Sequence, residues 1–243
     1  MSVLAAMLEA SPSSLWKLQE ASGSIADEVG GITGTVNQGT PGYDKPNIIP
    51  GWSDGKSFQF LNSDGGGIDF GNVYDFTGTT NYEVACWLFP TLFNAGSGHW
   101  IWGNNDSPGT RGWYFAVQGG PNWEHMRGDA SAQDVGGGAI GSTQVDYINR
   151  LHFVTVRFNG TQFIVHWNGA DFAPVASTRS LVAATTATGL RLGAHSLGGS
   201  GYDGYIALPA VWSGSTMTQA QREGIYRAAF GSIRPVNPQR LRT

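Results

Sequence analysis

Residues 98–125 (GHWIWGNNDSPGTRGWYFAVQGGPNWEH) combine the side-chain types that bind sugars. The stretch holds four of the nine tryptophans, with Asn, Asp, His and Arg side chains between them. An indole face stacks on the apolar C–H face of a sugar ring, and short polar side chains exchange hydrogen bonds with its hydroxyls. Tryptophan is equally a large core residue, so the surrounding elements decide between the two interpretations.

The stretch reads as a hairpin, with strands at 99–103 and 112–118 joined by the turn NNDSPGTR. Strand alternation places Trp100 and Trp102 on one face of the first strand. The second strand divides into Trp113, Phe115 and Val117 on one face and Tyr114 and Ala116 on the other. We expect Trp123 to be exposed in a following loop, where binding residues often lie. The candidate ligand-binding residues are therefore Trp123, Trp113, Asn104, Asn105, Asp106 and Arg111.

Catalytic chemistry has little support in the sequence. A retaining glycosidase needs two carboxylates about 5 Å apart, which one strand face can supply as Glu-x-Asp-x-Glu. No such triad occurs, and Glu83 stands alone on its strand. There is no Gly-x-Ser-x-Gly elbow, and the five histidines show no zinc-ligand spacing. We therefore expect a protein that is not an enzyme.

Three loops rich in aspartate and glycine are candidates for calcium binding through Asp27, Asp64 and Asp203. Calcium prefers several oxygen ligands carried by flexible loops of this composition. The alternative is that these Asp-Gly pairs are ordinary turn formers.

The overall composition excludes several other classes of function. Charged residues make up 13% of the 243 residues, the net charge is −4, and no basic face is evident, which argues against a nucleic-acid partner. A hydrophobic fraction of 40% excludes disorder. The single cysteine, Cys86, allows no internal disulfide. No stretch has transmembrane length, and the start MSVLAAMLEASPSS is a poor signal peptide, so we expect no membrane insertion.

The pattern of elements predicts an all-β protein. Residues 81–90 are apolar on both faces, which indicates a central strand covered on both sides. Two alternating strands flank Asn159-Gly160, the preferred pair for a type I′ turn. A capping box, Thr218 with Gln221, begins a helix over 218–229, and a second short helix is predicted over residues 2–10.

Five motifs occur in the order found in the laminin-G-like, concanavalin A-like jelly-roll superfamily, which the chain resembles over residues 13–230. They are LWKLQEASGSIADEVGG, GKSFQFLNSDGGGIDFG, NYEVACWLFP, RLHFVTVRFNGTQFIVHWNG and LRLGAHSLGGSGYDGYIALPAVWSGSTMTQAQREGIYRAA. The resemblance implies an antiparallel β-sandwich, a jelly roll, with one short C-terminal helix. Leu151 and Asn168 depart from the family, which has a tryptophan and an aspartate there. The implied division is a helical docking segment (1–12), a laminin-G-like domain (13–231) and a tail (232–243).

The N-terminus, a short apolar helix followed by Ser-Pro and LWKLQEASGSIADEVGG, is similar to proteins encoded among the tail genes of bacteriophages that infect GC-rich Gram-positive bacteria. This resemblance implies a virion protein, present in many copies or as a homo-oligomer, with other virion proteins as partners. The first hypothesis is a non-catalytic tail or particle-surface protein whose lectin-like domain binds host envelope carbohydrate. The alternative is a structural subunit whose jelly roll packs against its neighbours. A third is a cellular adhesin or lectin module.

Overall fold

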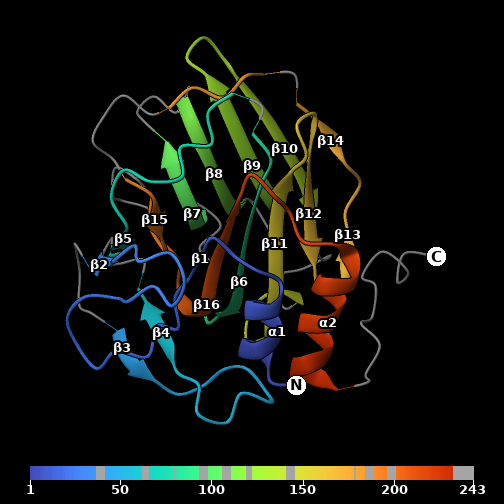
Figure 1. Cartoon of the computed structure of the whole chain (residues 1–243). Helices are drawn as coiled ribbons and strands as arrows, with labels where there is room; N and C mark the ends of the chain where they lie inside the picture. Colours follow the sequence, from blue (N-terminus) through green and yellow to red (C-terminus); the bar gives the residue numbers. More distant parts are fainter. Residues whose placement is uncertain are drawn as a thin grey trace.

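The computed structural model of the chain describes residues 1–36, 42–61, 66–78, 80–92, 98–105, 111–118, 122–140, 146–177, 179–183, 189–195 and 201–231. In these residues two antiparallel sheets pack against each other through a shared apolar core, and two helices lie on the outer side of one sheet (Figure 1). The predicted all-β sandwich with a C-terminal helix is confirmed.

The larger sheet has nine strands. They are β1 (Ser14–Leu15), β3 (Gly42–Lys45), β4 (Ser57–Phe60), β6 (Tyr82–Pro90), β11 (His152–Phe158), β12 (Gln162–Trp167), β13 (Ala170–Asp171), β14 (Val175–Ala176) and β16 (Gly204–Ser213). The main order is β13-β12-β11-β6-β16-β4-β3, while β1 pairs with β16 and β14 with β12. Strand β6 is therefore central, as its sequence predicts.

The second sheet has seven strands in the order β10-β9-β8-β7-β15-β5-β2. They are β2 (Thr35–Val36), β5 (Ile68–Asp69), β7 (His99–Asn105), β8 (Arg111–Gln118), β9 (Asn122–Asp129), β10 (Gln133–Ala139) and β15 (Arg191–Leu192). The stretch of sequence that raised the question of sugar binding thus supplies β7, β8 and the start of β9.

Two apolar cores hold these layers together. Alternate residues of β6 from Tyr82 to Leu88 enter the core between the sheets, whereas Ala85 and Trp87 point to a second core beneath the helices. Both faces of β6 are buried, which confirms the prediction for residues 81–90. Burial of large apolar side chains on both faces contributes about 1.5–3 kcal/mol for each such side chain.

The second core is closed by α1 (Val3–Glu9) and α2 (Gln219–Phe230), which come from opposite ends of the chain. Helix α1 buries Val3, Ala6 and Met7. The apolar face of the predicted docking segment therefore packs on the larger sheet of its own chain. The predicted capping box is present, with Thr218 and Gln221 exchanging hydrogen bonds at the start of α2. In the part of the chain that the structure describes, no helix is long and apolar enough to span a membrane.

The two Asn-Gly pairs form different turns. The hairpin of β11 and β12 is confirmed. Its turn runs from Asn159 to Gln162, and within this turn only Gly160 has a positive φ (97°). A type I′ turn needs positive φ at both central residues, so the predicted turn type is wrong there. Asn168 (φ 50°) and Gly169 (φ 88°), between β12 and β13, meet that requirement instead.

The segment after residue 121 was expected to be a loop, and that expectation is wrong. It forms β9, which pairs with β8 along its full length and continues into a hairpin with β10. The inward-facing residues of β9 include His125 and Arg127, both fully buried, so the strand lacks an alternating apolar pattern. The Arg127 guanidinium stacks 3.4 Å from the Phe158 ring centre and donates to the Gly78 carbonyl at 3.0 Å.

The predicted shared face of Trp100 and Trp102 is also wrong, because β7 contains a bulge. Trp100 pairs with Ala116 and Trp102 with the adjacent Phe115, which leaves Ile101 without a partner position on β8. One extra residue in a strand moves every following side chain to the opposite face of the sheet. Ile101 and Trp102 therefore enter the core between the sheets, while Trp100 lies on the outer face.

Candidate functional site

The aromatic candidates of the sequence are core residues. The predicted division of β8 is confirmed, with Trp113, Phe115 and Val117 in the core and Tyr114 and Ala116 on the outer face. Trp113 is fully buried, and its Nε1–H donates to the Tyr74 carbonyl at 3.0 Å. It therefore offers no face to a ligand.

Trp123 was expected to be exposed, and the structure contradicts this. It is the second residue of β9, is 2% exposed and packs against Phe172 with ring centres 5.8 Å apart. A buried indole face cannot stack on a sugar, so the stacking role predicted for Trp123 is wrong. Its Nε1–H, however, has no hydrogen-bond partner within the protein.

The polar candidates do not form an exposed platform either. Asn104 and Asn105 belong to β7 and are buried, and the Asn104 amide donates to Asp75 Oδ1 at 2.7 Å. Arg111 is the half-buried first residue of β8, paired in register with Asp129. Asp106 lies outside the described residues. The turn expected to carry these side chains is thus shorter than the sequence indicates.

Asp27, one of the calcium candidates, accepts hydrogen bonds from several backbone N–H groups. Its Oδ1 accepts from the backbone N–H groups of Leu15 (3.0 Å) and Val29 (2.9 Å), and its Oδ2 accepts from Ile32 (3.2 Å). Although burial opposes this, the hydrogen bonds to Asp27 lower the pKa of its carboxyl. The carboxylate therefore holds a turn, which was the alternative interpretation.

Asp203 is largely buried just before β16, and its carbonyl accepts from Thr91 at 3.0 Å. Asp64 lies outside the described residues. Among the residues that are described, no group of three or more His, Cys, Asp or Glu side chains could hold a metal ion. Calcium binding through the two remaining aspartates stays a prediction.

A polar pocket of about 480 Å³ lies where β8, β9 and β10 come together at one end of the smaller sheet. It is lined by Gln118, Asn122, Trp123, Glu124, Gly137 and Gly138. The register places Glu124 opposite Gly137 and Trp123 opposite Gly138 across the β9–β10 pair. The two glycines leave the space beside the β9 side chains open.

Gly138 matters most for the Trp123 indole. A Cβ at this position would lie 2.6 Å from the Trp123 Nε1 atom, which is closer than such atoms approach in proteins. Only glycine fits against the edge of the indole on this side. The unpartnered Nε1–H therefore points towards the side of β10 that has no side chain, and buried N–H groups without an acceptor are rare.

Glu124 supplies the negative charge of the pocket. Its Oε1 accepts from the Tyr114 hydroxyl and from Gln118 Nε2, the latter at 3.1 Å. Burial raises the pKa of Tyr114, and the hydrogen bond to Glu124 and its charge raise it further, so Tyr114 stays a neutral donor. These two donors fix the carboxylate, and among the described residues no donor contacts its Oε2.

The signal for this pocket was present in the run Gly136–Gly138, which sequence reasoning passed over. Glycine weakens a strand, so several in succession indicate that something must approach the backbone closely. The role of these glycines becomes clear only once residues 133–139 are known to pair with β9. The sequence does not reveal that pairing, because the inward face of β9 carries polar side chains.

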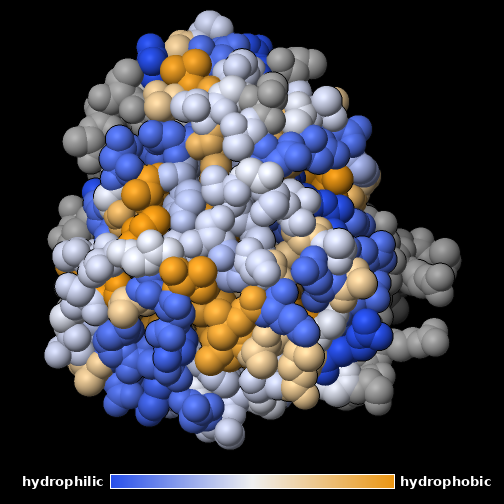
Figure 2. Space-filling model, viewed as in Figure 1, coloured by the Kyte–Doolittle hydropathy of each residue, from blue (hydrophilic) through white to orange (hydrophobic). Residues whose placement is uncertain are grey.

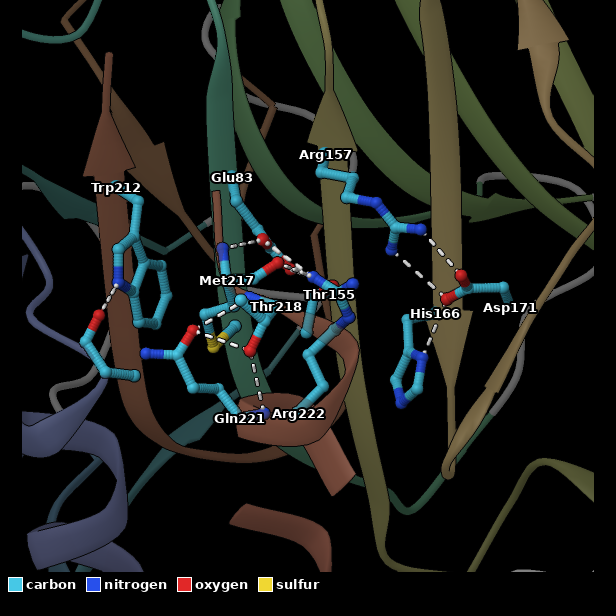
Figure 3. A network of polar contacts seen from close by, with 11 residues as sticks. Glu83, Thr155, Arg157, His166, Asp171, Trp212, Met217, Thr218, Gln221 and Arg222 are labelled. Atoms are coloured by element: carbon cyan, nitrogen blue, oxygen red, sulfur yellow. Dashed lines mark hydrogen bonds and ion pairs between the residues drawn. The ribbon is translucent and has the colours of Figure 1, made fainter. Parts of the chain in front are cut away.

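The outer face of the larger sheet carries a second set of polar contacts, shown in Figure 3. Glu83, fully buried, accepts from Arg222 Nη1 with both oxygens at 3.1 Å, from Thr155 Oγ1 at 2.6 Å and from the Met217 N–H at 2.7 Å. This network fastens the start of α2 to β6 and β11.

Beside it, His166 Nδ1 lies 2.8 Å from Asp171 Oδ1, and Arg157 also pairs with Asp171 (Figure 3). A histidine held by an aspartate occurs in hydrolases, where the other ring nitrogen contacts a nucleophile. His166 Nε2 is buried and has no hydrogen-bond partner, so no nucleophile is positioned on it. The arrangement stabilises the edge of the sheet.

No protein-family model matches the chain, and no curated protein sequence matches it. Solved structures of botulinum neurotoxin binding domains are similar in fold. The serotype D binding domain has 15% identity and a TM-score of 0.64, covering 91% of this chain and 52% of that one. The type G receptor-binding domain has 14% identity and a TM-score of 0.61, covering 89% and 51%.

A third structure is the serotype D ligand-binding domain in complex with N-acetylneuraminic acid, with 15% identity and a TM-score of 0.63. It covers 91% of this chain and 52% of that chain. The chain thus spans about half the length of these neurotoxin domains. At sequence identities this low, the TM-scores establish a shared β-sandwich fold.

Proposed function

We propose that the chain is a non-catalytic recognition module that binds carbohydrate in the pocket between β8, β9 and β10. The observation that carries the proposal is the Glu124 carboxylate, which lines the pocket and accepts from Tyr114 and Gln118 through Oε1, while no donor among the described residues contacts Oε2. The fold adds support, because a similar domain has been crystallised with a sugar.

The chemistry of the pocket suits a sugar hydroxyl. Such a group both donates and accepts, so it can donate to Glu124 Oε2 on the outer face of the sheet, where Tyr114 and Gln118 hold the other carboxylate oxygen. The amides of Asn122 and Gln118 add further donors and acceptors at the rim. Glu124 is the single carboxylate among the lining residues, whereas glycoside hydrolysis uses a pair.

The proposed setting is the surface of a bacteriophage particle, where the chain would contact other virion proteins. The support for this setting is the resemblance of the N-terminal sequence to phage tail proteins. A small pocket binds one sugar weakly, and many copies on one particle multiply weak contacts into firm attachment.

The test is a pull-down of the multimerised full chain on envelope fractions of GC-rich Gram-positive bacteria, with calcium and then with EDTA. We expect binding without release of sugar products, and loss of binding in Asn122→Ala. Gln133→Ala is the matched control, because Gln133 is exposed at the far end of the same hairpin. Failure of the folded protein to bind any fraction contradicts the proposal. A loss with EDTA, at unchanged stability, supports calcium.

The alternative, a structural subunit, is favoured by a different observation. A groove of about 750 Å³ runs between α1 and α2, lined largely by small and apolar residues. Leu8 (41% exposed) lies on α1, and Met1 (79% exposed) precedes it. Figure 2 shows apolar side chains gathered over α1. If this surface joins subunits, the chain will self-associate in light-scattering measurements, and Leu8→Lys will make it monomeric.

A further inference from the structure

The charge of the pocket between β8, β9 and β10 restricts which sugars it can hold. Among the described residues that line it, Glu124 is the only charged side chain. A ligand in this pocket therefore meets one carboxylate and neutral donors.

The position of the Glu124 carboxylate is fixed from one side. Tyr114, 8% exposed, and Gln118 both donate to Oε1, so the side chain cannot swing away to make room for an anion. Oε2 is left as an acceptor for the ligand. The other polar side chains that line the pocket are the primary amides of Gln118 and Asn122, which are neutral and neutralise no anion.

We propose that Glu124 selects sugars by charge, an inference that rests on the proposed function. Amine-bearing sugars bind most tightly, neutral sugars bind next, and sugars with a carboxylate are rejected. An ammonium group on the ligand can donate to Oε2 in a charge-assisted hydrogen bond, which is stronger than a neutral one. A ligand carboxylate has no proton to donate and repels Glu124.

The size of the discrimination follows from Coulomb's law. Two unit charges about 5 Å apart in a partly solvated site change affinity roughly 5- to 15-fold, in opposite directions for a cation and an anion. The preference weakens as salt screens the charges, with a screening length of about 8 Å at physiological ionic strength.

The experiment uses three sugars of one ring configuration that differ in charge: glucosamine, N-acetylglucosamine and glucuronic acid. Binding to the full chain is measured by NMR through the side-chain amide resonances of Gln118 and Asn122, for the wild type and for Glu124→Gln. Glutamine keeps an oxygen that accepts from Tyr114, so the pocket retains its shape. We expect glucosamine to bind roughly 5- to 15-fold more tightly than N-acetylglucosamine, and glucuronic acid more weakly by a similar factor. In Glu124→Gln the three affinities should converge.

Two results overturn the inference. If glucuronic acid binds as tightly as the neutral sugar, or if Glu124→Gln keeps the original order, the charge of Glu124 does not select ligands, while carbohydrate binding itself stands. If none of the sugars shifts these amide resonances, the pocket does not take this ligand class. The envelope pull-down then decides separately whether the chain binds carbohydrate elsewhere.

Discussion

The buried ion pair between Glu83 and Arg222 determines how firmly α2 is held on the larger sheet, and removing the arginine tests this. Arg222→Met keeps an unbranched stem but removes the guanidinium. Glu83 would retain its hydrogen bonds from Thr155 (2.6 Å) and Met217 (2.7 Å) and lose both contacts from Arg222. Breaking a buried pair costs about 3–5 kcal/mol. Because two hydrogen bonds remain, we expect about 3 kcal/mol.

The assay is urea unfolding followed by circular dichroism for Arg222→Met, Glu83→Gln and the double variant. The double variant leaves no buried charge, so we expect it to cost about 2 kcal/mol less than the sum of the singles. Arg227→Met is the matched control, since Arg227 lies on the same helix with its side chain 58% exposed, and we expect a change within about 0.5 kcal/mol. A loss below about 1 kcal/mol for Arg222→Met, or strictly additive singles, would refute the reasoning.

The remaining predictions concern acid stability, a turn and the pocket. Burial lowers the pKa of His125 to about 3 and those of His99 and His152 to about 4. The pKa of each histidine in the folded state lies below its unfolded value near 6.5, so the stability that depends on neutral histidine is complete above that pH and is lost below it. We expect the free energy of unfolding to fall by about 2 kcal/mol for each histidine between pH 7 and pH 5. Equal urea midpoints at the two pH values would contradict this. Gly169→Ala should cost about 1 kcal/mol in thermal unfolding because φ is 88° there. Gly138→Val should lower the urea midpoint because its Cβ would lie 2.6 Å from the buried Trp123 Nε1 atom, and an unchanged midpoint would contradict that close approach.

Much of the fold could be predicted because its central strands are apolar in a regular pattern. Strand β6 is apolar on both faces, and the Asn-Gly pairs and the Thr218 capping box mark where elements turn or begin. The β9–β10 hairpin could not be predicted in this way. His125 and Arg127 face the core there, and both are accommodated by partners far away in the sequence, Tyr82 and Phe158.

The pocket shares Trp123 with the residues that the sequence singled out, and its other lining residues differ from them. The sequence indicated exposed tryptophans, because four lie close together among polar residues, whereas the bulge at Ile101 and the sheet pairing bury them. The pocket depends instead on which residues stand opposite each other on β9 and β10. Strand register is set by the whole sheet, so local composition could not reveal that Gly138 faces Trp123.

The burial of every tryptophan has a consequence for optical work on this protein. None of the nine indoles is more than 8% exposed. Their combined fluorescence should therefore emit at short wavelength and resist quenching by iodide, and it should shift to the red when the chain unfolds. Trp123 contributes one ninth of the fluorophores, so a sugar in the pocket can alter the total emission only slightly. In a fluorescence titration, a large spectral shift would report loss of the fold rather than occupancy of the pocket.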